Sequence, residues 1–348
     1  PLDSPMSSRG DQPAFGVHMS LSIEELASTA TEVIETASLV VAGLAAEKER
    51  ISAVVKDDRS PVTVADYSVQ AIVGLHLRDC SVRSMVGEED AERLREDPAL
   101  RSEVVATTRR VVPGVSEDEV LESIDSGCHE GGAHGSFWTL DPIDGTKGFL
   151  RGGQFAIALG LISDGVVELG LLGLPHWGLI EDPSGGSVRP PGSVCLAIRG
   201  RGAEGWVIGS SDRRPLRVAD WTAEHPIRTC ESVESGHTSH DASARIVEVF
   251  SGHRAVRLDS QAKYAVVGSG AADAYLRLPT RPGYVERIWD HAAGSLVAAE
   301  AGAVVSDVRG RDLDFSRGRG LEDNRGVVCA VPAAHPLIID RIRELELG

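Results

Sequence analysis

Two apolar segments joined by a short turn place an antiparallel pair of strands near the middle of this 348-residue chain. Residues 155–162 (FAIALGLI) and 166–174 (VVELGLLGL) flank a Ser-Asp-Gly turn at residues 163–165, a pattern typical of a β-hairpin. Just before them, residues 138–140 (WTL) have the composition of a further buried strand. That strand ends in residues 141–145 (DPIDG), where Asp-Pro and Asp-Gly are ordinary turn dipeptides.

Helical periodicity occurs on both sides of these strands. Residues 22–25 (SIEE) fit a capping box, and the apolar residues after them recur at helical spacing to about Lys48. A second helix is expected from about Asp66 to Leu77, and residues 84–90 (SMVGEED) resemble a short strand that ends in acidic residues. Later in the chain short strands alternate with helices, and Gly302 suits the end of a helix over residues 291–302. The sequence therefore predicts a mixed α and β fold.

Composition excludes several classes of protein. The chain carries 35 Lys and Arg against 52 Asp and Glu, a net charge of −17, whereas nucleic acid is bound by basic surfaces. An anionic small substrate would need local cations. The five cysteines are scattered without a CxxC spacing, which favours a reducing compartment and a cytoplasmic location. No apolar run approaches the roughly 18 residues of a membrane span, so no membrane partner is expected.

Acidic residues stand at predicted strand ends and helix starts in four distant parts of the chain. Asp66 and Asp290 could simply be helix N-caps, and Glu88 and Glu89 could be a solvated acidic surface. Taken together with Asp141 and Asp144, however, they supply several carboxylates with no cysteine or histidine pair among them, and Mg²⁺ prefers such all-oxygen ligands. Two cations roughly 3.5 to 4 Å apart would clamp both the attacking and the leaving oxygen of a phosphate ester.

The DPIDG segment suits such a site better than it suits a plain turn. Asp141, at a rigid strand end, can bridge two cations, and Ile143 can offer its backbone carbonyl oxygen. The residues that follow, Gly145-Thr146-Lys147, would open a helix whose free N–H groups face an anion.

Two longer segments resemble the signatures of a known family. Residues 141–162 (DPIDGTKGFLRGGQFAIALGLI) and 289–307 (WDHAAGSLVAAEAGAVVSD) are similar to those of the lithium-sensitive inositol monophosphatase superfamily. Within it, SPVTVADYSVQ, VGEE, ESVESGHTSHD and LDSQAKYAVVGSGAADAYLRLP resemble the bisphosphate nucleotidases in order and spacing. The resemblance runs from about residue 22 nearly to the C-terminus. It implies a layered α-β-α-β-α sugar-phosphatase fold with the site between two halves.

The resemblance also implies roles for individual residues, carried over position by position. Two or three Mg²⁺ ions would be held by Glu88, Asp141, the carbonyl of Ile143, Asp144 and Asp290. The catalytic pair that activates water would be Asp66 and Thr146. The substrate would be bound by Thr146, His237, Ser260, Lys263, Arg277 and Asp290.

The implied activity is a Mg²⁺-dependent phosphomonoesterase that removes the 3′-phosphate of adenosine 3′,5′-bisphosphate, giving AMP. Action on 3′-phosphoadenosine 5′-phosphosulfate, and with it a place in nucleotide metabolism and sulfur assimilation, is expected as well. Three alternatives stay open: an inositol-polyphosphate 1-phosphatase, a fructose-1,6-bisphosphatase, and a nucleotide-binding sensor without turnover.

The expected organisation has three parts. Residues 1–18 are polar and patternless and are expected to be a disordered or processed tail. Residues 19–190 form the expected N-terminal α+β half with the metal site, and residues 191–348 the C-terminal α/β half with the nucleotide contacts. The Pro- and Gly-rich residues 183–192 suggest the boundary, and residues 91–135 are expected to be partly helical and mobile.

Overall fold

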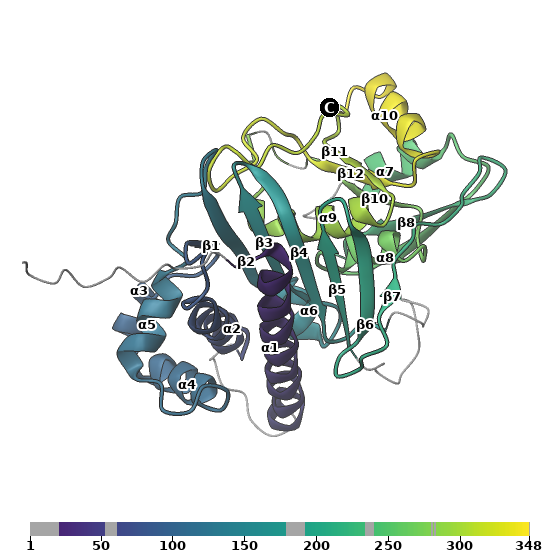
Figure 1. Cartoon of the computed structure of the whole chain (residues 1–348). Helices are drawn as coiled ribbons and strands as arrows, with labels where there is room; N and C mark the ends of the chain where they lie inside the picture. The colour runs from purple at the N-terminus through teal and green to yellow at the C-terminus, as the bar shows by residue number, and fades with distance from the viewer. Residues whose placement is uncertain are drawn as a thin grey trace, which may run out of the picture.

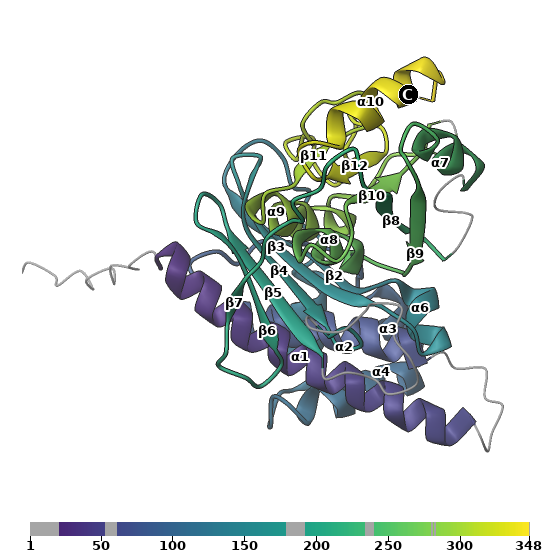
Figure 2. The ribbon, with the colours of Figure 1, turned by 90° about the vertical axis from the view of Figure 1, so that its right-hand side faces the viewer.

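Two β-sheets separated by a pair of helices form the frame of the fold (Figure 1). The structure, a computed structural model, describes residues 21–52, 61–178, 192–233, 240–279, 281 and 283–347. Helices α1 and α2, the larger sheet, helices α8 and α9, the smaller sheet, and helices α7 and α10 follow one another as layers (Figure 2). The predicted mixed α and β architecture in an α-β-α-β-α arrangement is confirmed.

The larger sheet contains seven strands in the order of the chain. They are β1 (Met85–Gly87), β2 (Ser136–Asp144), β3 (Ala156–Ser163), β4 (Val166–Leu174), β5 (Ser193–Ile198), β6 (Gly202–Val207) and β7 (Arg214–Pro215). Strand β1 runs parallel to β2, and the remaining neighbours are antiparallel. The predicted hairpin is β3 and β4, and Asp164 (φ 49°) and Gly165 (φ 78°) take the left-handed conformations that a tight hairpin turn requires.

Helices α1 (Ile23–Ser52) and α2 (Pro61–Leu77) cover one face of this sheet. The capping box at the start of α1 is present, because Ser22 N donates to Glu25 Oε2 over 2.7 Å and Glu25 N donates to Ser22 Oγ over 3.2 Å. By length and composition residues 23–46 could cross a membrane, contrary to the expectation from apolar runs. Thr, Ser and Glu interrupt the apolar residues of this helix, so it contains no long apolar run. Ala30, Val33, Ile34 and Ala37 form a stripe that is buried against α2 and β4.

Residues 92–125 contain three short helices rather than an extended loop. They are α3 (Glu92–Glu96), α4 (Pro98–Arg109) and α5 (Glu117–Asp125). Leu94, Leu100, Val104, Val120 and Ile124 form an apolar cluster with residues of α2, so the predicted partly helical region has a small core of its own.

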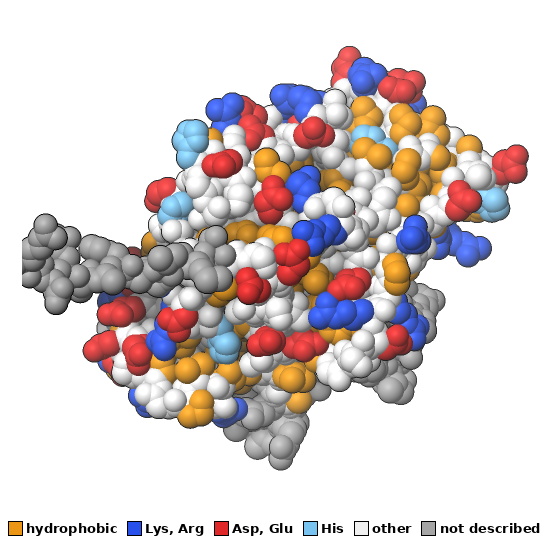
Figure 3. All heavy atoms as spheres, in the orientation of Figure 1, with side chains coloured by type: hydrophobic (Ala, Val, Ile, Leu, Met, Phe, Trp, Pro, Cys, Tyr) orange, Lys and Arg blue, Asp and Glu red, His pale blue; other side chains and the backbone are white. Residues whose placement is uncertain are grey.

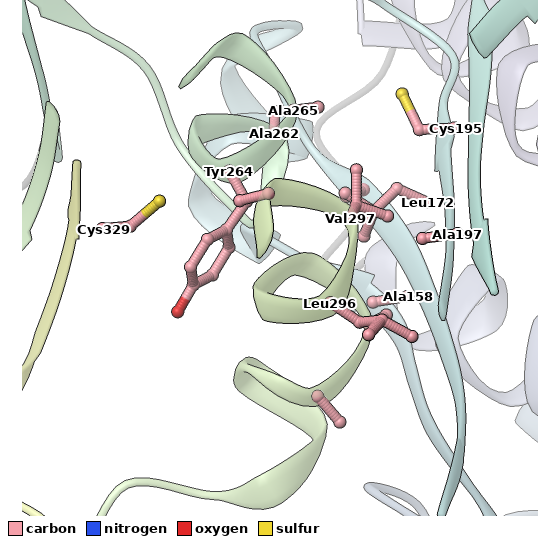
Figure 4. Close-up of a cluster of buried hydrophobic side chains, with 14 of the residues drawn as sticks. Ala158, Leu172, Cys195, Ala197, Ala262, Tyr264, Ala265, Leu296, Val297 and Cys329 are labelled. Carbon is pink, nitrogen blue, oxygen red and sulfur yellow. The ribbon is translucent and has the colours of Figure 1, made fainter. Parts of the chain in front are cut away.

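The middle layer lies close to the larger sheet because two glycines face it. Helix α8 (Ala262–Gly268), the 3₁₀ turn η1 (Ile288–Asp290) and α9 (Ala292–Glu300) make up this layer. Gly160 of β3 and Gly170 of β4 are directly paired. A Cβ atom on Gly170 would lie 2.6 Å from the carbonyl oxygen of Ala293 in α9. Apolar side chains continue this contact, as Figure 4 shows for Ala158, Leu172 and Ala197 of the sheet against Leu296 and Val297 of α9.

The smaller sheet has the order β11-β12-β10-β8-β9. Its strands are β8 (Ile227–Glu231), β9 (His253–Arg257), β10 (Ala274–Arg277), β11 (Val304–Ser306) and β12 (Val327–Ala330). Helices α7 (His240–Val247) and α10 (His335–Glu344) lie outside it, and α6 (Thr146–Arg151) follows β2. The predicted C-cap of α9 is confirmed, since Gly302 follows the helix with φ 102°.

The division between the sheets does not coincide with the boundary expected at residues 190 and 191. Strands β5 and β6 follow that boundary in the chain, yet β5 pairs with β4 and β6 pairs with β5 along their lengths. The sheets therefore divide between β7 and β8, after residue 215. The expected tail at residues 1–18 and most of residues 183–192 lie outside the described residues.

Acidic and basic side chains are mixed on the one face of the molecule that Figure 3 shows. Among the described residues there, the acidic side chains are interspersed with Lys and Arg rather than gathered in one area.

The close contact between β4 and α9 generates a stability prediction. Gly170→Ala should lower the free energy of unfolding by about 1 to 3 kcal/mol, because the added methyl group can only fit if α9 moves away. Gly43→Ala is the matched control: Gly43 lies in α1 with no atom within 4 Å of its added Cβ, so the same change should stabilise by about 0.5 to 1 kcal/mol. Urea denaturation of both variants measures this, and equal effects at the two positions would contradict it.

Candidate active site

The predicted acidic residues converge at the end of the larger sheet where β1 and β2 terminate. They form an acidic cluster of Asp66, Glu88, Glu89, Asp141, Asp144 and Asp290. Because β1 and β2 are parallel with Gly87 opposite Leu140, Glu88 and Asp141 follow side by side at the same edge. The two carboxyl groups interact directly, and each affects the pKa of the other. The pairing of β2 with β3 becomes irregular between Asp141 and Asp144, which turns the chain at this point.

Asp141 is the centre of the cluster. Its side chain is 3% exposed, and among the described residues its Oδ1 atom has no hydrogen-bond partner. Burial raises the pKa of Asp141 well above its ordinary value, and the charges of Glu88, Asp144, Asp290 and Asp66 raise the pKa further. Carboxyl groups from α2, from the chain after β1, from β2 itself and from η1 thus act on one buried carboxyl group.

The neighbouring carboxyl groups are perturbed in the same direction. Burial, then the charge of Glu89, raises the pKa of Glu88 to about 7, and burial raises that of Asp290 to about 6 in spite of Arg277. Burial also raises the pKa of Asp144, against the opposing effect of Lys263. Burial raises the pKa of Asp66 well above its ordinary value, and the charges of Glu89 and Glu88 raise it further.

The positions of Asp66 and Asp290 exclude the simple helix-cap interpretation of both residues. Helix α2 begins at Pro61, five residues before the predicted start, so Asp66 lies inside the helix and is buried. Asp290 ends η1, and the residue that caps α9 is His291. A cap must lie at the first turn with a free N–H group in reach, and neither residue meets that condition.

The turn after β2 connects the acidic cluster to the segment around Ser260. Gly145 has φ 86°, and a Cβ atom there would be 3.0 Å from Ser260 Cβ. Asp144 Oδ2 accepts a hydrogen bond of 2.5 Å from the backbone N of Gln261. Thr146, the exposed first residue of α6, donates from Oγ1 to the carbonyl of Ile143 over 3.3 Å.

Two of the predicted substrate contacts, Ser260 and Lys263, flank Gln261, whose backbone binds Asp144. Ser260 is buried with φ 68°, and its Oγ accepts from Ala262 N over 3.1 Å. Lys263 is also buried, and its Nζ donates to the carbonyl of Leu258 over 3.3 Å. Burial lowers the pKa of Lys263 to about 8, while the charge of Asp144 acts in the opposite direction. His237 lies outside the described residues.

Arg277 joins these contacts to Asp290. Its Nη2 atom lies 3.7 Å from Asp290 Oδ2 and 2.6 Å from Glu286 Oε2, and its Nε donates to Glu286 Oε1 over 2.9 Å. Glu286 therefore holds the guanidinium in a bidentate pair.

The network behind Arg277 was not identified from the sequence. His291 Nδ1 is 2.8 Å from the Tyr264 hydroxyl oxygen, and His291 Nε2 is 3.3 Å from Glu286 Oε2. Glu286 and His291 flank Asp290 in the segment ERIWDHAAG, but only the structure reveals their link to Tyr264. Glu286, Asp290 and His291 are close enough to hold a metal together, yet both oxygens of Glu286 are already bound by Arg277.

The donors in the acidic cluster fit a hard divalent cation. They are carboxylate oxygens with one nearby backbone carbonyl, and the unpartnered Oδ1 of Asp141 lies among them. Buried like charges at this density require a countercharge.

Comparison with known proteins agrees with the fold. A profile of the inositol monophosphatase family matches residues 22–347. The 3′(2′),5′-bisphosphate nucleotidase of Schizosaccharomyces pombe is 39% identical over 308 residues, which cover 84% of this chain and 87% of that protein. The 3′(2′),5′-bisphosphate nucleotidase of Oryza sativa is 40% identical over 309 residues, covering 83% of this chain and 85% of that protein.

Solved structures share the architecture at lower sequence identity. Mycobacterium tuberculosis SuhB superimposes with a TM-score of 0.59 at 20% identity, covering 93% of this chain and 98% of SuhB. CysQ from Bacteroides thetaiotaomicron, a bacterial member of the inositol monophosphatase family, gives a TM-score of 0.57 at 18% identity, with 89% and 98% of the two chains covered. On the family match and the identity to these relatives, the chain belongs to the inositol monophosphatase family.

Proposed function

We propose that the protein is a 3′(2′),5′-bisphosphate nucleotidase that hydrolyses the 3′-phosphate of adenosine 3′,5′-bisphosphate to AMP and phosphate. The observation that carries this proposal is the convergence of four carboxyl groups on Asp141, whose Oδ1 has no hydrogen-bond partner among the described residues, with Lys263 and Arg277 acting on the same cluster. Relatives that are 36–40% identical over most of their length bear that name. Action on 3′-phosphoadenosine 5′-phosphosulfate belongs to the same proposal, because that molecule has the same 3′-phosphate.

The family is metal-dependent, and we assign its metal to the acidic cluster. Glu88, Asp141, the carbonyl of Ile143, Asp144 and Asp290 are the residues that would hold two or three Mg²⁺ ions. When bound, such ions supply charge neutralisation and a water of lowered pKa.

The residues of the chain divide the remaining work. We assign to Asp66, which is buried and interacts with Glu88 and Glu89, the role of accepting a proton at its carboxylate from the attacking water. Thr146 is exposed and within hydrogen-bond distance of the Ile143 carbonyl, so its hydroxyl can orient that water.

A second phosphate needs cations away from the acidic cluster. Arg277 has Nη1 free of the bidentate pair with Glu286, and Lys263 lies near both Asp144 and Arg277. We assign Ser260, Lys263, Arg277 and His237 to nucleotide binding, with Thr146 and Asp290 close to the phosphate that reacts.

Two alternatives predict different outcomes in one assay. An inositol-polyphosphate 1-phosphatase would release phosphate faster from inositol 1,4-bisphosphate than from adenosine 3′,5′-bisphosphate, whereas a sensor would release it from neither. We expect faster release from the nucleotide with Mg²⁺ and none with EDTA. Preference for the inositol substrate would overturn the nucleotide assignment.

The first prediction concerns Asp141. Asp141→Asn keeps the size of the side chain but removes the charge that the cations would share, so kcat should fall by about 10²- to 10³-fold. Asp212→Asn is the matched control, since Asp212 is exposed and paired with Arg214. Steady-state kinetics at saturating Mg²⁺ measures both. Near-normal turnover of Asp141→Asn would show that the metal assignment is wrong.

The second prediction separates substrate anchoring from chemistry. Lys263→Met keeps the buried stem but removes the ammonium group, so KM for adenosine 3′,5′-bisphosphate should rise about tenfold or more, with some loss of kcat. Arg277→Lys should act in the same direction because it loses the bidentate geometry. Nitrophenyl phosphate has no second phosphate and should be affected less. Equal losses on both substrates would contradict the anchoring role.

The third prediction concerns lithium. Li⁺ is small and hard enough to occupy an all-oxygen site of Mg²⁺ size, but its single charge neutralises less. The position near Asp141, Asp144 and Asp290 must open for product release, so Li⁺ should trap a complex that still contains product. Initial rates at saturating Mg²⁺ should then show uncompetitive or mixed inhibition with respect to substrate. Purely competitive inhibition, or none at millimolar Li⁺, would contradict this arrangement.

A further inference from the structure

We propose that Arg319 is a positioning residue that holds together the two segments of the acidic cluster that carry Glu88 and Asp290. Its side chain holds the end of β1, which leads into Glu88, and its backbone holds the segment that leads into Asp290. The inference rests on the metal site proposed above, but it concerns a residue outside the signatures that suggested that site.

The guanidinium fixes the end of β1 from one side. Arg319 Nη2 donates to the carbonyl of Gly87 over 2.6 Å, and Nη1 donates to the carbonyls of Gly127 and His129 over 3.2 and 3.0 Å. Gly87 N also donates to Gly127 O over 2.8 Å, so β1 and the chain at residues 127–129 are held as one unit. Gly87 immediately precedes Glu88.

A buried glutamine fixes the same loop from the other side. Gln70 Oε1 accepts from Glu89 N over 3.1 Å, and its Nε2 donates to the carbonyls of Glu89 and Ile124 over 2.5 and 2.8 Å. The residues on both sides of Glu88 are therefore anchored, one by Arg319 and one by Gln70. The position of the Glu88 carboxylate depends on both anchors.

The same arginine is attached to the segment before Asp290. Ile288 N donates to Arg319 O over 3.2 Å, Leu321 N donates to Glu286 O over 2.8 Å, and Arg287 pairs with Gly320. The guanidinium carbon lies 4.9 Å from the centre of the Trp289 ring, and Trp289 immediately precedes Asp290. One residue thus spans two ligand-bearing segments that are about 200 positions apart in the chain, from Glu88 to Asp290.

Only an arginine can make this set of contacts. Three carbonyl oxygens accept from two nitrogens of one planar group, and that plane also lies over an indole ring. A lysine has a single compact ammonium group and cannot reproduce the fork or the stacking. Residues that orient metal ligands without touching the metal typically change metal affinity by about 10- to 100-fold when they are substituted.

The experiment measures metal binding directly in the full chain without substrate. Mn²⁺ is the probe, and its free concentration is followed by electron paramagnetic resonance during titration of the wild type, Arg319→Lys, Arg319→Gln and Arg317→Gln. Arg317 is the matched control, since it lies in the same loop and forms ion pairs with Asp314 and Asp323 rather than with the chain around Glu88. Both Arg319 variants should bind Mn²⁺ about 10- to 100-fold more weakly, and the control should bind as the wild type does.

A kinetic measurement distinguishes positioning from a general loss of structure. Raising Mg²⁺ should restore part of the lost kcat in Arg319→Lys, while KM for the nucleotide at saturating Mg²⁺ stays near the wild-type value. Thermal unfolding in EDTA gives the stability without metal, and Arg319→Lys should remain folded at the assay temperature. If Arg319→Gln does not fold, the Mn²⁺ affinity of Arg319→Lys alone tests the inference.

Three results would overturn the inference. They are wild-type Mn²⁺ affinity in both Arg319 variants, equal weakening in Arg317→Gln, and failure of both Arg319 variants to fold, which would make the residue a requirement of the fold. Failure of the proposed function looks different: the wild type would bind no Mn²⁺, or Asp141→Asn would bind it as tightly as the wild type.

Discussion

The site depends on electrostatic repulsion between carboxyl groups that the fold holds together. Asp141 is buried near the end of β2, and Glu88, Asp144, Asp290 and Asp66 each raise its pKa. Strand β1 lies beside β2, α2 covers the same edge, and η1 approaches from the other half of the chain. Ionising these groups together without a countercharge costs free energy, and the packing of the surrounding elements must offset that cost.

Asp144 interacts with groups of both charge signs. Its charge raises the pKa of Glu88, whereas the positive charges of Lys263 and Arg277 lower the pKa of Asp144 itself. Arg277 is kept in place by Glu286, which His291 and Tyr264 support in turn. For a substrate with two phosphates, this arrangement would orient one phosphate toward the carboxyl groups, where the metal is proposed, and the other toward the cations.

Local patterns in the sequence predict the elements well, and long-range contacts escape them. The hairpin of β3 and β4, the capping box of α1 and the glycine after α9 follow from neighbouring residues, so the sequence alone identifies them. The division between the sheets after residue 215, rather than near residue 190 as expected, does not follow from neighbouring residues, because the pairing of β5 with β4 depends on a partner across a long connection. The acidic residues were recognised by residue type and by family resemblance, whereas Glu286, His291 and Arg319 act through partners that no spacing reveals.

The middle helical layer has a consequence for how the chain is made. Helix α9 (residues 292–300) covers β3, β4 and β5, which end at residue 198, and Gly160 of β3 and Gly170 of β4 leave room for it. During synthesis from the N-terminus, roughly a hundred further residues must leave the ribosome before that apolar face meets its partner. At about 5 to 20 residues per second, the interval lasts many seconds. The nascent sheet is therefore open to chaperones, or to association with other chains, until the last third of the protein returns to it.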